Sequence, residues 1–304
     1  MTWFAPVGAS DRTVLARWAA GVGPPVVHTA PAGDLSADTL LVVSWNIALG
    51  AGDVTRLLRD ASVGQPGAHV VLLLQEVYRE GPEVPGKAQD GVRFAGKLGA
   101  EGQRRPEIEA IAAAEGLNLY YVPSMRNGSP LVSDEDRGNA ILSTLPLSDF
   151  SAIELPFERQ RRVAVAATIS GRTSEGLSWN LRVVSSHLDN LVGARRGWIF
   201  GGESARTRQA RALVEYLQGS DAVVLGGDFN TWFGFNEGTY VEIARAFPDT
   251  SSHDRRPTFM GFLRLDHLFF RLPAGWRGQF HRAADRYGSD HYPLVATIDL
   301  RPSL

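Results

Sequence analysis

Apolar runs of strand length recur along the chain and alternate with segments of helical periodicity, and this alternation limits the possible folds more than any other feature. The runs lie at 40–47, 69–77, 119–124, 139–147, 162–169, 180–188, 222–229, 264–272 and 293–300. Helical candidates lie between several of them, at 53–63, 105–117 and 205–218. Because near-continuously apolar strands must be covered on at least one face, the pattern predicts a mixed α/β fold.

The connection between two of these runs limits the topology further. Residues 162–188 form two strand patterns joined by a Gly/Ser turn, "SGRTSEG", so part of the sheet must be antiparallel and a purely doubly wound fold is disfavoured. Residues 1–38 indicate an irregular lead-in with one short helix at 10–20. We expect this lead-in to pack on a single catalytic domain formed by residues 39–304.

The composition excludes several kinds of site. The chain has no cysteine, which rules out disulfides, thiolate metal sites and a cysteine nucleophile, so that any metal must be held by oxygen or imidazole ligands. A net charge of −2 gives no global basic field for nucleic acid, so any such field must be local. We find no secretory signal pattern, no apolar stretch of about 20 residues and no sign of an obligate protein partner. The sequence therefore predicts a cytoplasmic location.

Acid, amide or imidazole residues stand at the ends or starts of many apolar runs. They are Asn46 in "SWN", Gln75 and Glu76 in "LLLQEV", His187 in "VSSHLDN", Asp228 and Asn230 in "GGDFN", Asp266 in "RLDHLFF", and Asp290 and His291 in "YGSDHYP". Taken singly, each could be loop chemistry, and Asp228 with Asn230 could form an Asx turn. In extended chain, however, those two side chains would point the same way, and strand ends that gather at one edge form ligand sites.

The residue types in this set favour one kind of chemistry. Glu76, Asp228 and Asp290 are hard oxygen ligands that suit Mg²⁺, or Mn²⁺ in its place. Asparagine amides donate to phosphoryl oxygens without repelling them, and histidines donate protons or hydrogen bonds to a phosphoryl transition state. A second acid such as Asp266 can fix the tautomer of a histidine. The set therefore predicts metal-assisted hydrolysis of a phosphoester.

Seven segments in order, "SWN", "LLQE", "GNAILS", "SSHLDN", "GGDFNT", "RLDHLFF" and "SDHYPL", resemble the endonuclease/exonuclease/phosphatase superfamily over about residues 40–300. The resemblance implies a DNase I-like, four-layer α/β/β/α sandwich in which two mixed, largely antiparallel sheets pack face to face. It also implies a Mg²⁺-dependent phosphoesterase.

The resemblance further implies a role for each residue of the set. Glu76 would be the main metal ligand, with Asp290 and Asn46 near the metal. The scissile phosphate would contact Asn46, Asn230 and His187. Asp228 would position or activate the attacking, metal-associated water. His291, paired with Asp266, would serve as general base or as a phosphate-binding imidazole. His187 matches the histidine-type branch and argues against a close relative of the abasic-site endonucleases.

The substrate is less constrained by the sequence. Arginine clusters at 103–105, 158–162, 193–197, 205–211 and 254–256 could rim a cleft for a phosphate backbone, although each cluster alone is typical of a solvated surface. Aromatic side chains beside them, Trp198, Phe200, Trp232, Phe233 and Phe235, could stack on a base or enter a lipid headgroup layer. The glycine-rich stretch at 81–105 exceeds ordinary connection lengths and is expected to be a substrate-facing loop.

We expect a phosphodiesterase that acts on nucleic acid, hence a nuclease. Two alternatives stay open: a sphingomyelinase-like phospholipid hydrolase or small-molecule phosphatase, and a catalytically inactive binding scaffold of the same fold. His267 alternates with Asp266 along its strand and should face away from it, so we expect a structural role for His267.

Overall fold

The computed structural model describes residues 1–31, 33–64, 68–85, 105–127, 135–190, 200–250 and 254–301. Most of the predicted loop at 81–105, the arginine cluster at 193–197 and Trp198 lie outside the described residues, as does the side chain of Phe200.

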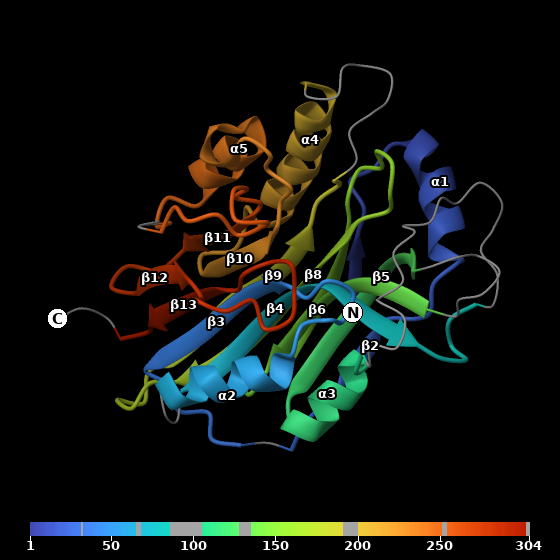
Figure 1. Ribbon diagram of the computed structural model, residues 1–304. Helices are drawn as coiled ribbons and strands as arrows, with labels where there is room; N and C mark the ends of the chain where they lie inside the picture. The colour runs from blue at the N-terminus through green and yellow to red at the C-terminus, as the bar shows by residue number, and fades with distance from the viewer. Residues whose placement is uncertain are drawn as a thin grey trace.

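Two β-sheets form the centre of the molecule (Figure 1). The order of the six-stranded sheet is β1 (Thr2–Phe4), β7 (Leu147–Glu154), β8 (Val163–Arg172), β9 (Ser178–His187), β10 (Val223–Asp228) and β11 (Asp266–Arg271). The order of the seven-stranded sheet is β12 (Arg277–Arg282), β13 (Leu294–Asp299), β3 (Thr39–Asn46), β4 (His69–Glu80), β6 (Glu135–Ser143), β5 (Asn118–Asn127) and β2 (Val26–His28). Within the described residues, the pairs β1/β7, β9/β10 and β3/β4 are parallel and the other pairs are antiparallel.

Helices cover the outer face of each sheet. They are α2 (Val54–Gly64), α3 (Ile108–Glu115), α4 (Phe200–Tyr216) and α5 (Gly238–Ala246), while α1 (Ala9–Ala19) lies to one side, near the end of β5 (Figure 1). In Figure 1, α4 and α5 lie over the six-stranded sheet and α2 and α3 lie under the seven-stranded one. The predicted four-layer sandwich and its largely antiparallel sheets are confirmed.

Burial on both faces explains why the strands are apolar without interruption. On β8, Val163 and Val165 point into the core between the sheets, whereas Ala164 and Ala166 point toward the cluster under α4 and α5. Apolar side chains on both faces are the pattern expected of a strand covered on both sides. The predicted antiparallel pairing of β8 with β9 is also confirmed.

The lead-in contains more regular structure than its sequence suggests. In addition to α1, which matches the predicted short helix, it supplies β1 to the edge of one sheet and β2 to the edge of the other. Four further elements were not predicted as such: η1 (Gly234–Asn236), α5, β12 and β7. None of the helices in the described residues has the length and apolar character needed to cross a membrane.

Candidate active site

Three of the predicted site residues form a row across the six-stranded sheet. Asp228, the last residue of β10, lies opposite His187 of β9 on one side and Asp266 of β11 on the other. Directly opposed residues on neighbouring strands place their side chains on the same face of a sheet. The strand order and register therefore bring an imidazole and two carboxylates together, with His187 Nε2 3.5 Å from Asp228 Oδ2.

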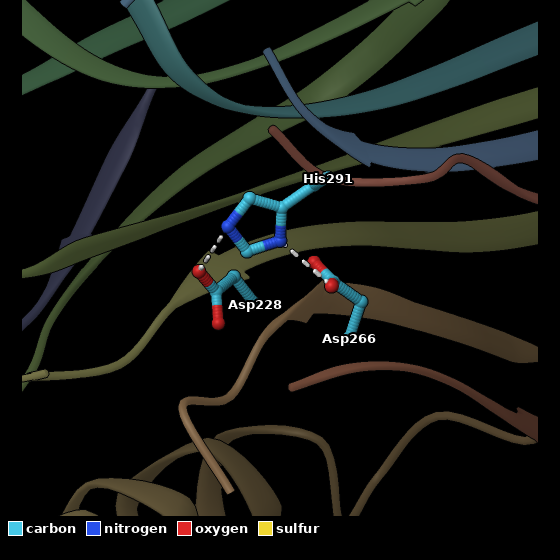
Figure 2. Close-up of side chains that lie close together, drawn as sticks. All are labelled: Asp228, Asp266 and His291. Carbon is cyan, nitrogen blue, oxygen red and sulfur yellow. Dashed lines mark hydrogen bonds and ion pairs between the residues drawn. The ribbon is translucent and has the colours of Figure 1, made fainter. Parts of the chain in front are cut away.

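His291 lies between the two carboxylates of this row (Figure 2). Its Nδ1 is 2.8 Å from Asp266 Oδ2, and its Nε2 is 3.8 Å from Asp228 Oδ2. All three side chains are buried, and Asp266 Oδ1 has no hydrogen-bond partner among the described residues. The Nδ1 contact fixes the orientation of the ring and leaves Nε2 directed at Asp228.

The backbone around His291 is held by contacts with the end of β3 and with Ser289. Trp45 Nε1 donates a hydrogen bond to the carbonyl of His291, and Ser289 Oγ donates one to the carbonyl of Asn46 while accepting one from the His291 backbone N–H. The ring of Phe259 packs on the imidazole at a centroid distance of 4.6 Å. These contacts lock the rotamer and position of a side chain that lies outside any strand.

The two asparagines occupy different positions relative to Asp228. Asn46, at the end of β3 in the other sheet, donates from Nδ2 to Asp228 Oδ2 at 3.0 Å and thus joins the two sheets at the site. Asn230 has a φ of 50°, so the extended-chain argument does not hold there. Its backbone N–H donates to Asp228 Oδ1 in an Asx turn, and its Nδ2 donates to the carbonyl of Leu188. Asp228 and Asn230 therefore form the Asx turn that the sequence allows, and the Asp228 carboxylate also contacts the two histidines.

Glu76 owes its position to a bulge in β4. The register of β4 with β6 shifts between Leu74 and Val77, and Glu76 itself has a φ of 50°. A bulge of this kind redirects a side chain that strict alternation would bury. The carboxylate of Glu76 is largely enclosed and lies 3.3 Å from Arg137 Nη1 on β6.

Burial and neighbouring charges shift the titration of the central pair. Burial raises the pKa of Asp228 to about 7, with a further contribution from the charge of Asp266. Burial by itself lowers the pKa of His291, but the charges of Asp266, Asp228 and Asp290 outweigh it and raise that pKa to about 10. The imidazole of His291 is therefore positively charged at neutral pH.

His187 behaves in the opposite way. Burial lowers its pKa well below the ordinary value, and the positive charges of Arg162, Arg137 and His291 lower it further. His187 is therefore neutral at physiological pH. The site thus contains one charged and one neutral imidazole, both close to Asp228.

The structure brings together the residues that the sequence singled out. Asn46, His187, Asp228, Asp266 and His291 are connected directly, and Asn230 through its backbone. Asp290 has a side chain that is 44% exposed, with Oδ1 3.9 Å from His291 Nε2, and Glu76 shares a pocket with His187.

One group of three side chains within the described residues is close enough to hold a divalent cation. The ligand atoms of Asp228, Asp266 and His291 lie within 4.8 Å of one another. Their burial and the Nδ1 contact, however, leave little room for the waters that Mg²⁺ normally keeps. Glu76 and Asp290 retain carboxylate oxygens with partial exposure, which suits a hydrated hard cation better.

Sequence reasoning missed Arg137 at the site and named Arg162 only as a member of the 158–162 cluster. Arg137 and Arg162 line the pocket beside Glu76 and His187. The solvated-surface interpretation of the 158–162 cluster is wrong for Arg161 and Arg162, which are both buried. Arg161 pairs with Glu154. The only available signal for Arg137 was its place two residues before Asn139 in the family segment "GNAILS".

The same surface interpretation fails for part of the 205–211 cluster. Arg206 is buried and paired with Glu237 between α4 and the start of α5. The structural role expected for His267 is confirmed: its Nε2 is 2.7 Å from Thr231 Oγ1, and its ring packs on Phe229 and Tyr240 behind the row.

Exposed apolar side chains surround one side of the site. Trp232 and Phe233 directly follow the Asx turn, and Met260 and Phe262 lie at the tip of the turn that begins with Phe259. These four side chains are 44–68% exposed.

Comparison with known proteins places this geometry in a family. A family model described as endonuclease/exonuclease/phosphatase family matches residues 43–291. A comparison with curated proteins found no match.

Solved structures share the fold at low sequence identity. An endonuclease/exonuclease/phosphatase family protein from Bacteroides thetaiotaomicron is 14% identical, with a TM-score of 0.52, and the match covers 86% of this chain and 97% of that chain. The 3′ phosphatase NExo from Neisseria, bound to product DNA hairpin, is 17% identical, with a TM-score of 0.50 and coverage of 84% and 98%. Sphingomyelinase C from Streptomyces griseocarneus is 17% identical, with a TM-score of 0.47 and coverage of 85% and 99%.

The family model spans every predicted site residue from Asn46 to His291, and within that span Asp228, Asp266 and His291 form a buried acid–imidazole centre. The chain belongs to the endonuclease/exonuclease/phosphatase family.

Proposed function

We propose that this chain is a Mg²⁺-dependent phosphodiesterase that hydrolyses nucleic acid by direct attack of water, without a covalent intermediate. Members of the family are metal-dependent phosphoester hydrolases. The observation that supports the proposal most strongly is the buried contact of His291 with Asp266, next to Asp228. A binding scaffold has no need of two buried carboxylates around a charged imidazole, since their burial costs stability.

Of the predicted metal ligands, Glu76 and Asp290 suit a Mg²⁺ ion best, and Asn46 is the third member of that set. The donors are carboxylates and an amide, the chain has no thiolate, and both carboxylates keep some exposure. Bound there, the ion would supply positive charge to the phosphate and ease deprotonation of water.

His291 and the side chains of the row have separate roles in the proposed reaction. Asp228, whose pKa is raised to about 7, is suited to orient the attacking water and to accept its proton. His291 is positively charged and held by Asp266, so its Nε2 can donate to a phosphoryl oxygen as charge develops. The neutral His187 can donate from the other side of Asp228.

The choice of nucleic acid rests on two features of the surroundings. Arg137 and Arg162 supply positive charge beside Glu76 and His187, and arginine suits phosphate groups. Trp232 and Phe233 are exposed immediately after the Asx turn, where a base next to the scissile phosphate could stack.

A second candidate, a phospholipid phosphodiesterase, is favoured by the exposed turn beside His291. Met260 and Phe262 extend from this turn into solvent, while Phe259 at its base contacts the imidazole. Apolar side chains at the mouth of a hydrolytic site can enter a lipid interface. A small-molecule phosphatase has no comparable observation in its favour.

The test is Mg²⁺-dependent hydrolysis across plasmid DNA, single-stranded DNA, RNA, bis-p-nitrophenyl phosphate and sphingomyelin vesicles. His291→Ala should abolish turnover with the fold intact, and the matched control His281→Ala, at an exposed histidine on β12, should retain it. Cleavage of DNA or RNA that requires Mg²⁺ and His291 is expected. Cleavage of sphingomyelin alone would support the second candidate, and no cleavage by protein that binds Mg²⁺ would contradict both.

A further inference from the structure

The pocket beside Glu76 lies where the two strands that neighbour β6, β4 and β5, each have a bulge beside the same part of β6. The bulge of β4 lies across from Asn139, next to Gly138, and β5 has a register shift between Pro123 and Met125 on the other side. A Cβ on Gly138 would lie 2.0 Å from the carbonyl oxygen of Val122, so only glycine fits there. The two irregular strands leave a pocket lined by Glu76, Ser124, Met125, Arg137, Gly138, Asn139, Arg162 and His187.

Buried hydrogen-bonding atoms in this pocket lack partners. Nε of Arg137 and Nε of Arg162 have no acceptor among the described residues, although both side chains are more than nine-tenths buried. Asn139 Oδ1 is also without a donor, while its Nδ2 donates to Val163. Buried donors without acceptors are rare in folded proteins, and here two guanidinium groups at one place each have such a donor.

The two arginines of the pocket differ in their ion pairing. Arg137 pairs with Glu76, but among the described residues Arg162 forms no ion pair and donates only to the amide oxygens of Gln160 and Asn190. The negative charges of Asp189, Glu76 and Asp228 act on Arg162 without an ion pair to it. A buried guanidinium that has no ion pair is a place where a bound anion would be stabilised.

We propose that Arg137 and Arg162 form a subsite for a second phosphate group of the substrate, next to the scissile phosphate. This inference rests on the proposed function for its place in catalysis, although phosphate binding itself can be tested without turnover. The scissile phosphate belongs with Asp228 and His291, and no hydrogen bond or ion pair joins either arginine to those two residues in the described structure. The subsite therefore selects phosphodiesters that carry a neighbouring phosphate over isolated diesters.

The first experiment measures binding of inorganic phosphate by calorimetry, in chelator and at low salt, so that neither metal nor catalysis contributes. Arg162→Met and Arg137→Met should each weaken phosphate binding about 10- to 100-fold, the loss expected for hydrogen bonds to a charged group. Arg208→Met, at an exposed arginine of α4, is the matched control and should bind as the wild type does. Equal phosphate affinity in all four proteins, or none in the wild type, would overturn the proposal.

Thermal unfolding separates a ligand-binding arginine from a structural one. Without phosphate, Arg162→Met should unfold at the same temperature as the wild type or higher, because the substitution removes a buried charge that has no ion pair among the described residues. Phosphate should then raise the unfolding temperature of the wild type but not that of the variant. A variant that is less stable without phosphate would support a structural role instead. Arg162→Lys, which keeps the charge, should retain part of the phosphate response.

The second experiment compares two substrates with the same leaving group, the p-nitrophenyl ester of thymidine 5′-phosphate and its 3′-phosphorylated form. The wild type should show a KM about tenfold or more lower for the second, and Arg162→Met should remove that advantage while kcat changes little. An equal loss of kcat on both substrates would place Arg162 at the scissile phosphate and overturn the proposal. If neither substrate is cleaved, the proposed function is in question, and the phosphate-binding result decides on the subsite alone.

Discussion

Replacing Asp266 with asparagine removes one negative charge from beside the His291 imidazole and leaves the shape of the site almost unchanged. Both side chains are buried, so solvent does not screen the interaction, and the distance from His291 Nδ1 to Asp266 Oδ2 is 2.8 Å. Coulomb's law with an effective dielectric constant of about 20 gives about 6 kcal/mol at that distance, equivalent to about 4 pKa units. The pKa of His291 should then fall from about 10 to a value near that of an ordinary histidine.

The substitution should slow catalysis because the His291 imidazole would no longer be a charged hydrogen-bond donor. At a pH of about 8 the imidazole of Asp266→Asn would be neutral and no longer fixed in one tautomer, so kcat should fall by a factor of about 10² to 10⁴ while KM changes little. The assays are an NMR titration of the histidine ring protons and kcat for bis-p-nitrophenyl phosphate.

Asp254→Asn is the matched control, because Asp254 pairs with the half-exposed Arg256 away from His291. It should leave both the pKa of His291 and kcat unchanged. The reasoning fails if the pKa of His291 in Asp266→Asn stays close to the wild-type value, or if kcat falls by less than about threefold.

Three further predictions concern metal binding, pH dependence and packing. Glu76→Gln should weaken Mg²⁺ binding about tenfold or more, measured by metal titration, and raise the Mg²⁺ concentration needed for activity. Because the folded-state pKa of Asp228 is raised to about 7, its stabilising protonated form is fully present below the unfolded pKa and is lost as the pH rises through about 7. At pH about 8, Asp228→Asn should therefore be more stable than the wild type, by up to about 4 kcal/mol, and unfold at a higher temperature. At pH about 4 it should not unfold at a higher temperature than the wild type. A lower unfolding temperature of the variant at pH about 8 would refute this. Gly138→Ala should lose about 3 kcal/mol or more in urea unfolding because its Cβ meets the carbonyl of Val122, whereas Gly219→Ala, which meets nothing within 4 Å, should not.

Most of the strands could be predicted because the fold buries them on both faces. The missed elements lack that property. The first half of β7 is largely solvent-facing, and β12 is an edge strand in which only Phe280 is buried, so neither gives a long apolar run. In α5 the helical pattern is short, begins at Gly238 and contains Val241 and Ile243, which favour strands.

For the site, the sequence indicates which residue types matter, but not how they meet. His187, Asp228 and Asp266 share a row only because β9, β10 and β11 are neighbours in one register. The position of Glu76 depends on a bulge, which no periodicity predicts. The burial of Arg162 depends on the way in which β4, β5 and β6 fit together. From the sequence alone, an arginine is expected at the surface.

The two short strands of the lead-in have a consequence for how the protein folds and how it can fail. Val26–His28 pairs with residues roughly 90 positions later, and Thr2–Phe4 with residues roughly 150 positions later. During synthesis these segments emerge long before their partners, so neither can pair until its partner strand, β5 or β7, has been made. Once in place, they cap one edge of each sheet. A proteolytic cut between β2 and β3 would leave the catalytic row untouched and yet expose two strand edges to other chains, so aggregation, rather than loss of the active site, should be the first result.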